Sequence, residues 1–168
     1  MKKTALMLMA VSLVAVAGCT KKQKPEDLPP PPVGAEGNTG ATTPAGPTPG
    51  SQADFVANIT ADRIYFDTDK SDIDAEDQAT LSSQAEWLKR YPAVRVTIEG
   101  HADERGTRDY NIALGARRAN AAKNALAGMG IDAGRISTVS YGKERPEALG
   151  STEADWARNR RAVTVTVQ

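Results

Sequence analysis

The stretch VRVTIEGHADERGTRDYNIALGARRANAAKNALAGMG, residues 94–130, decides the fold because its periodicity changes halfway along. Its first eight residues alternate apolar and polar side chains, which is typical of a strand with one buried face. From near Arg108 to Met129, small and apolar residues recur at helical spacing, so we expect a helix that ends at the glycines 128 and 130. The small residues of its inward stripe would let this helix lie close to a sheet. That stripe comprises Ile112, Gly115, Ala119, Ala122, Leu126 and Met129.

Strand and helix patterns alternate on both sides of this stretch. Before it, residues 63–66 are typical of a strand and residues 75–90 of a helix that ends before Pro92. After it come a strand at 136–142, a short helix at 151–159 that starts like a capping box, and a strand at 162–167. The order βαβαβαβ predicts a fold of the α/β (α+β) class, with a single mixed sheet and helices packed on it.

Residues 20–52 differ in composition from the rest of the chain. Eight of the ten prolines fall there, among Gly, Thr and Ala, with almost no large apolar side chains. Such a segment cannot bury enough surface to offset its ordering entropy, so we expect a disordered tether. The domain boundaries that follow are a signal peptide over 1–18, a lipidated cysteine with its tether over 19–52, and a folded domain over 53–168.

The N-terminus predicts export and lipid attachment. A short basic head precedes an apolar run that is too short for a stable membrane anchor. The sequence VAGC, residues 16–19, resembles the bacterial lipobox, in which cleavage precedes a cysteine that is then acylated. Thr20, rather than Asp, follows Cys19 and resembles the sorting pattern for the outer membrane. The alternative is an ordinary signal peptide that contains a cysteine by chance.

Several classes of function are disfavoured by the sequence. Equal numbers of acidic and basic residues, 21 each, do not suggest a nucleic-acid partner. His101, Asp103 and Glu104 could supply metal ligands, but the chain has no second histidine. His101 beside a carboxylate could serve a catalytic triad, yet no Gly-x-Ser-x-Gly motif is present. Asp103 paired with Glu99 or Glu104 keeps glycan hydrolysis open on spacing alone.

A binding pocket is the third possibility for the same region. Asp103 follows the second expected strand, while Asn111, Leu114 and Arg118 form one stripe of the following helix. A guanidinium takes a carboxylate bidentately and Asp takes an ammonium, so Asp103 and Arg118 suit a zwitterionic ligand. Two simpler alternatives remain open: the two residues form a salt bridge with each other, or Arg118 is a solvated helix arginine.

Four motifs in order make the chain similar to the OmpA-like peptidoglycan-binding domain family. They are YFDTDKSDI (65–73), EGHADERGTRDYNIALGARRANA (99–121), VSYGKERPEALG (139–150) and NRRAVTV (159–165). The resemblance implies that Asp103, Arg118 and the backbone amides of Thr68 and Asp69 bind the meso-diaminopimelate of the peptidoglycan stem peptide. It also implies that Asn111 and Leu114 support the pocket.

For the remaining motif residues the resemblance implies structural roles. His101 is expected to be a structural hydrogen-bonding residue. Arg160 and Arg161 are expected to pair near the sheet, with a role in ligand binding as the alternative. Thr68 replaces an aromatic residue of some relatives, which leaves only side-chain stacking there in question.

The resemblance further implies a function without catalysis or cofactors. The expected protein is an outer-membrane lipoprotein whose periplasmic domain holds the peptidoglycan, with TolB and TolA as partners and a role in constriction at cell division. The alternatives are a wall-binding module without Tol partners, an adaptor that binds only proteins, and a wall-modifying enzyme.

Overall fold

The computed structural model describes residues 46–167, and its helices and strands follow the predicted alternation. In chain order the elements are α1 (Gln52–Asn58), β1 (Arg63–Tyr65), α2 (Ala75–Arg90), β2 (Arg95–His101), α3 (Arg108–Gly128), the 3-10 helix η1 (Ala133–Arg135), β3 (Ile136–Gly142), α4 (Glu153–Asn159) and β4 (Arg161–Val167). The fold class is therefore confirmed, with α1 and η1 as additions. The expected signal peptide, Cys19 and most of the tether lie outside the described residues.

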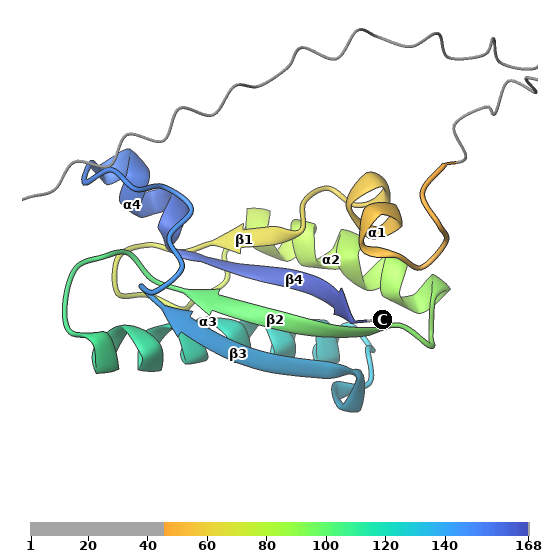
Figure 1. Cartoon of the computed structure of the whole chain (residues 1–168). Helices are drawn as coiled ribbons and strands as arrows, with labels where there is room; N and C mark the ends of the chain where they lie inside the picture. Colours follow the sequence, from red (N-terminus) through yellow and green to blue (C-terminus); the bar gives the residue numbers. More distant parts are fainter. Residues whose placement is uncertain (1–45, 168) are drawn as a thin grey trace, which may run out of the picture. The chain divides into compact units, whose positions relative to one another are not determined.

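The four strands form one mixed sheet in the order β1-β4-β2-β3 (Figure 1). β2 and β3 are parallel neighbours, and α3 provides the connection between them. The C-terminal strand β4 enters between β1 and β2 and runs antiparallel to both. β2 and β4 are the two interior strands, so each pairs with a strand on both sides. Residues next to the ends of β2 and β4 therefore lie close to other strands.

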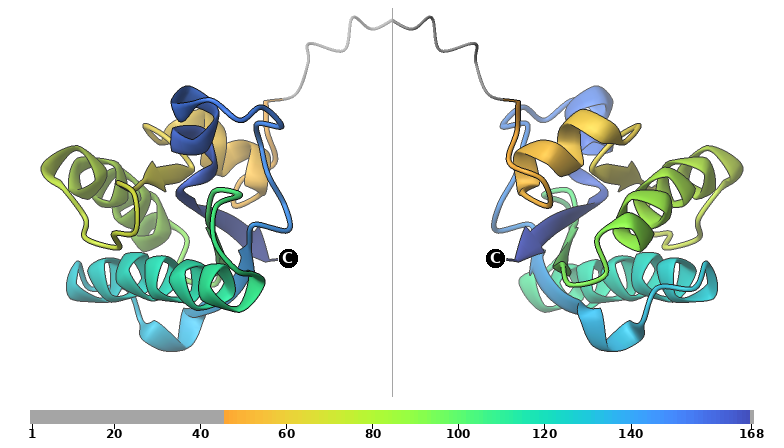
Figure 2. Two further views of the ribbon diagram at one scale, coloured as in Figure 1. Left: turned by 90° about the vertical axis from the view of Figure 1, so that its left-hand side faces the viewer. Right: turned by 90° about the vertical axis from the view of Figure 1, so that its right-hand side faces the viewer.

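The two long helices cover one face of the sheet. Figure 2 shows α2 and α3 on the same side, and the two helices contact each other. Apolar side chains from these helices meet those of the strands in one core, with Trp87 fully buried at its centre. Among the described residues, no helix has both the length and the apolar character needed to cross a membrane.

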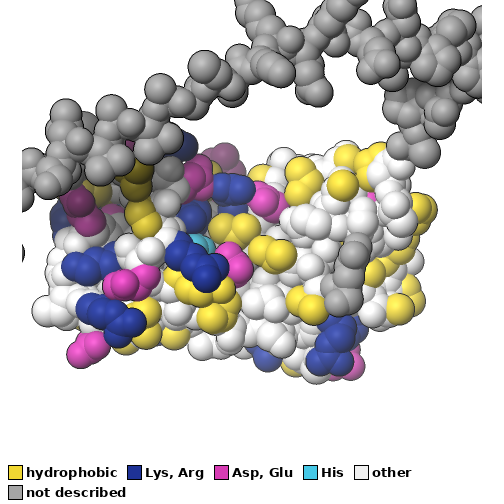
Figure 3. All heavy atoms as spheres, viewed as in Figure 1, with side chains coloured by type: hydrophobic (Ala, Val, Ile, Leu, Met, Phe, Trp, Pro, Cys, Tyr) yellow, Lys and Arg dark blue, Asp and Glu magenta, His cyan; other side chains and the backbone are white. Residues whose placement is uncertain are grey.

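The other face of the sheet has both hydrophobic and charged side chains. Figure 3, drawn in the same view as Figure 1, shows hydrophobic side chains in the middle of this face. Charged side chains of both signs gather toward the end where α4 lies. That end also holds the polar loops between β2 and α3 and between β3 and α4.

α3 approaches the sheet at two glycines. A Cβ atom placed on Gly100 of β2 would lie 1.8 Å from the carbonyl oxygen of Gly115, and one on Gly115 would lie 2.4 Å from Oγ of Ser140. The predicted close approach of small residues is therefore confirmed. The buried stripe is rotated relative to the prediction: Asn111, Leu114 and Arg118 are buried, whereas Ile112 and Met129 are only partly buried.

Helix caps behave as the sequence predicts. Thr152 and Asp155 form a capping box at the start of α4, in which each side chain meets the backbone amide of the other residue. Asp74 caps α2 by accepting a hydrogen bond from the amide of Asp77. The caps fix where α2 and α4 begin, and these two helix ends border the region of the predicted site.

Candidate ligand-binding site

Asp103 lies directly beyond β2, at the end of the sheet. The pairing of β2 with β3 shifts register between Gly100 and His101, and the amide of Ala102 donates to the carbonyl of Gly142. Asp103 is 7 % exposed, and its carboxylate accepts hydrogen bonds from Arg105 and Arg160. Burial opposes ionisation, but the hydrogen bonds from Arg105 hold the pKa of Asp103 below its ordinary value. Asp103 is therefore an anion at neutral pH.

The turn after β1 faces Asp103. The amide of Lys70 donates to the carbonyl of Asp67 at 3.2 Å, and Asp69 has a φ of 59°, in the left-handed region. Among the described residues, neither the amide of Thr68 nor that of Asp69 donates a hydrogen bond to another group. The structure thus leaves two backbone donors of this turn available, at the positions that the sequence analysis assigns to a ligand carboxylate.

Arg118 is completely buried beneath this turn. Its Nε donates to the carbonyl of Lys70 at 2.9 Å, Nη1 to that of His101 at 2.8 Å, and Nη2 to that of Asp67 at 3.0 Å. Its guanidinium also lies 5.2 Å from the centre of the Phe66 ring. Arg118 therefore ties the turn to the end of β2.

Both simpler alternatives for Arg118 are wrong. The residue is not solvated, and within the described chain it forms no ion pair with Asp103 at 4.0 Å or less. Burial, together with the nearby charge of Arg160, lowers the pKa of Arg118 to about 10, so the guanidinium stays charged at neutral pH. Three carbonyls accept hydrogen bonds from three of its five N–H donors, so a positive charge lies under the turn.

Asn111 and Leu114 lie on the same helix face as Arg118, about two turns and one turn closer to the start of α3. Asn111 is buried, and its side-chain amide donates to the carbonyl of Arg105 at 2.7 Å. It thereby fixes the loop between Asp103 and α3, whose first turn is capped by Thr107. Leu114 is buried as well. Both residues shape the surroundings of Asp103 from within the protein.

Arg160 joins the site from the β4 side, whereas Arg161 belongs to a different cluster. Arg160 donates from Nε to the carbonyl of Phe66 at 2.9 Å and from Nη2 to Glu153 at 2.8 Å, and it reaches Asp103 at 3.5 Å. Arg161 lies 3.3 Å from Glu147. Both arginines therefore pair with protein groups.

His101 is 2 % exposed, and neither ring nitrogen has a hydrogen-bond partner in the described part of the chain. The hydrogen bond that His101 makes at the site is through its backbone carbonyl, which accepts from Nη1 of Arg118. Burial and the charge of Arg161 lower the pKa of His101 to about 4. Residues 46–167 contain no group of three His, Cys, Asp or Glu side chains placed to hold a metal.

The burial of His101 predicts a pH dependence of stability. Its folded-state pKa of about 4 lies below the ordinary 6.5, so the unfolded chain takes up the proton first as the pH falls. We expect the free energy of unfolding to fall by up to about 3 kcal/mol between pH 6.5 and 4. Urea unfolding of the wild type and of His101→Asn across this range measures the effect. A wild-type slope no steeper than that of the variant would contradict the prediction.

Arg105 was missed by the sequence analysis. It donates to Asp103 from Nε at 3.1 Å, from Nη2 at 2.6 Å and from its backbone amide at 3.1 Å. Its Nη2 also lies 3.3 Å from Oγ1 of Thr68, so one side chain connects Asp103 with the turn. The signal available in the sequence was its position, two residues after Asp103 in the same loop.

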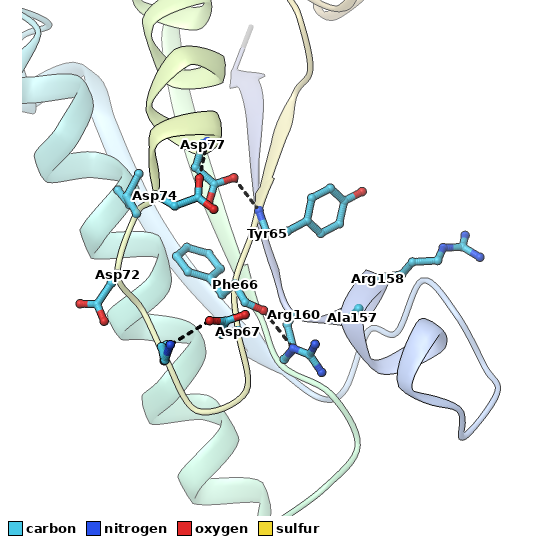
Figure 4. Close-up of a pocket in the computed structure, with 11 residues that line it drawn as sticks. Tyr65, Phe66, Asp67, Asp72, Asp74, Asp77, Ala157, Arg158 and Arg160 are labelled. Carbon is cyan, nitrogen blue, oxygen red and sulfur yellow. Dashed lines mark hydrogen bonds and ion pairs between the residues drawn. The ribbon is translucent and has the colours of Figure 1, made fainter.

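A cavity of about 480 Å³ lies next to this cluster (Figure 4). It shares Asp67, Lys70 and Arg160 with the site, but neither Asp103 nor Thr68 lines it. Its acidic wall comes from the start of α2, where Asp74 and Asp77 lie. The cavity is therefore a neighbour of the predicted site and not the site itself.

The chain matches the OmpA family over residues 65–160, which include the turn, Asp103, Arg118 and Arg160. The chain belongs to the OmpA family. Within it, the chain is similar to proteins named peptidoglycan-associated lipoprotein. That of Agrobacterium fabrum is 50% identical over 164 residues, covering 98% of this chain and 88% of the relative. That of Haemophilus influenzae is 44% identical over 157 residues, covering 94% of each.

Solved structures agree with this grouping. The crystal structure of the peptidoglycan-associated lipoprotein from Burkholderia pseudomallei has a TM-score of 0.64 and 41% identity, covering 68% of this chain and all of that one. The C-terminal domain of Helicobacter pylori MotB has a TM-score of 0.60 at 20% identity, covering 64% of this chain and 84% of that one. The second similarity shows a shared fold. The first shows in addition that the equivalent of the folded part exists as a separate crystallised unit.

Proposed function

We propose that this chain is a lipoprotein of the outer membrane whose periplasmic domain binds the diaminopimelate of the peptidoglycan stem peptide without forming a covalent bond. Lipid on Cys19 and the site at Asp103 would be two anchors joined by the tether, so that the chain connects the membrane to the wall. Many weak attachments of this kind would hold the two layers strongly while each contact stays reversible.

One observation carries the proposal: the buried anion Asp103 lies a short gap away from a turn whose amides at Thr68 and Asp69 are free within the described chain and which has the Arg118 guanidinium beneath it. A single nitrogen of Arg105 reaches both Oδ2 of Asp103, at 2.6 Å, and Oγ1 of Thr68, at 3.3 Å. One nitrogen therefore bridges the gap between these two oxygens, as the nitrogen of a ligand ammonium could. Asp103 would take the ammonium of the ligand, and the amides of Thr68 and Asp69 would take its carboxylate.

Arg118 would act on the same carboxylate from below. Its buried positive charge lies beneath the turn, and its hydrogen bonds to the carbonyls of Asp67 and Lys70 hold the turn in place. Charge and backbone donors together favour an anion at this place, as in other sites where successive amides converge. Asn111 and Leu114 would hold the loop and helix that border the pocket.

A function without catalysis is supported by the saturation of the site's charged groups. Asp103 is ionised and held by arginines, and the His101 ring is buried, which leaves neither group placed to transfer a proton to a bound substrate. The partnership with TolB and TolA in the Tol–Pal system, and the role in constriction at cell division, complete the proposal. They are supported by the combination of lipobox, tether and single OmpA-like domain, and co-purification with TolB tests them.

Binding to sacculi tests the wall-binding function. We expect residues 20–168 to sediment with diaminopimelate-type sacculi, and Asp103→Asn to lose affinity by on the order of 30-fold or more, because it removes one partner of a buried charge pair. Asp109→Asn removes an exposed carboxylate at the start of α3 and should sediment like the wild type. Circular dichroism shows whether each variant is folded.

The composition of the wall supplies a second comparison. Lys-type sacculi lack the second carboxylate of diaminopimelate, so the turn amides would have no anion to bind, and sedimentation should be weaker. Equal sedimentation of the wild type with both walls would argue against recognition of this carboxylate. Release of soluble fragments from the sacculi would instead identify an enzyme.

A further inference from the structure

The carboxylate of Asp103 has no free position for a ligand in this structure. Oδ1 accepts hydrogen bonds from the amide and Nε of Arg105, both at 3.1 Å. Oδ2 accepts from Nη2 of Arg105 at 2.6 Å and from Nη1 of Arg160 at 3.5 Å. A carboxylate offers about four lone-pair positions, and four donors occupy them. An incoming ammonium must therefore displace one of the arginines.

Arg160 is not the group that can leave. Its side chain is buried, and two other strong contacts fix it: the carbonyl of Phe66 at 2.9 Å and the carboxylate of Glu153 at 2.8 Å. Moving it would leave buried donors and acceptors without partners, which is costly. Arg105 differs because its side chain is 39% exposed, so solvent and neighbouring groups can receive its guanidinium.

The structure already offers a second resting place for the Arg105 guanidinium. Its central carbon lies 4.2 Å from the centre of the Trp156 ring, and its Nη1 lies 3.9 Å from Glu153. The Trp156 ring is held in turn by Glu104, which accepts a hydrogen bond from its Nε1 at 3.0 Å. Arg105 can therefore release Asp103 and keep its contacts with α4.

We propose that Arg105 is a displaceable latch over the ligand site. This inference rests on the proposed function. In the structure the latch connects Asp103 with Thr68; when the ligand's ammonium takes its place at Asp103, the guanidinium is released there and keeps its contacts with Trp156 and Glu153. The latch makes each attachment weaker than an open site would allow. It also selects ligands that carry an ammonium group, because a ligand without one gains nothing by displacing the guanidinium.

Calorimetric titration with the tripeptide L-Ala-γ-D-Glu-meso-diaminopimelate tests the latch on residues 20–168. We expect Arg105→Ala to bind on the order of tenfold more tightly than the wild type, because the charge-assisted hydrogen bonds of the latch no longer compete. Arg105→Lys keeps the positive charge but lacks the planar guanidinium with its several donors. Its affinity for the tripeptide should therefore lie between those of the wild type and Arg105→Ala. Arg108→Ala removes an exposed arginine at the start of α3 and should bind like the wild type, which controls for the loss of charge.

Fluorescence gives a second readout. Tripeptide should change the tryptophan emission of the wild type but not that of Trp156→Phe, because the other tryptophan, Trp87, is fully buried in the core. Unchanged or weaker binding by Arg105→Ala would overturn the latch while the wall-binding function stands. If Asp103→Asn binds the tripeptide as the wild type does, the proposed site is wrong and the latch falls with it.

Discussion

Gly100→Ala is expected to destabilise the protein by about 3 kcal/mol or more. The new Cβ would lie 1.8 Å from the carbonyl oxygen of Gly115, which belongs to the backbone of α3 and cannot move without moving the helix. Overpacking a well-packed core costs about 1–3 kcal/mol even where side chains can adjust, and occasionally more. A shift of the urea midpoint to much lower concentration, measured by circular dichroism, is the expected result.

Gly128→Ala is the matched control for this prediction. Gly128 is the last residue of the same helix, and a Cβ there would meet nothing within 4 Å. The stability of this variant should stay unchanged or rise by up to about 1 kcal/mol, because alanine favours helix over glycine. If the two variants unfold at the same urea concentration, α3 does not depend on contact between the two backbones.

The two elements that meet at Gly100, β2 and α3, could be predicted from the sequence because their residue patterns repeat over the whole element. β2 alternates over its length, and α3 repeats small residues over several turns. α1 could not be predicted in this way: it has seven residues, of which only Asp54 and Phe55 are buried. Phe55 packs edge-on against Trp87, 4.9 Å away between ring centres, so a contact distant in sequence stabilises this helix.

The order of the strands in the sheet could not be predicted from local sequence patterns either. Alternating residues predict that β4 has a buried face, but they do not say that it pairs with β1 on one side and β2 on the other. That choice places Arg160, directly before β4, beside Asp103, which follows β2. The neighbourhood of the site is thus a consequence of sheet topology.

Sequence motifs point to the residues of the candidate site, but they do not show how buried these residues are or what they contact. In the structure, Arg105 connects Asp103 with Thr68 of the turn at 67–70. The motifs could not show that Arg118 is buried, because the carbonyls that accept its hydrogen bonds belong to residues far away along the chain. An arginine that satisfies three backbone carbonyls can occupy a core stripe that amphipathic patterning reserves for apolar side chains.

Arg118→Met is accordingly expected to cost about 3–5 kcal/mol of stability, because it removes three hydrogen bonds from a charged donor, each worth about 1.5–3 kcal/mol. Methionine fills most of the volume but donates nothing, so the carbonyls of Asp67, Lys70 and His101 lose their donors. Arg117→Met is the control: it replaces an exposed arginine at the preceding position of α3 and should change stability by less than about 0.5 kcal/mol. Urea unfolding of the two variants measures the difference directly.

Arg118→Lys separates two proposed roles of this residue: to place a positive charge beneath the turn and to orient the backbone of the turn. Lysine keeps the positive charge beneath the turn, but its single ammonium cannot match three carbonyls that a planar guanidinium reaches at 2.8–3.0 Å. If the charge alone attracts the ligand, the folded variant should bind diaminopimelate-type sacculi almost as the wild type does. If the arginine must also aim the amides of Thr68 and Asp69, binding should fall by tenfold or more although the charge remains, since each misplaced charge-assisted hydrogen bond is worth on the order of tenfold. We expect the second result, because every hydrogen bond that Arg118 makes in the described chain goes to the backbone, and two of the three go to the turn itself.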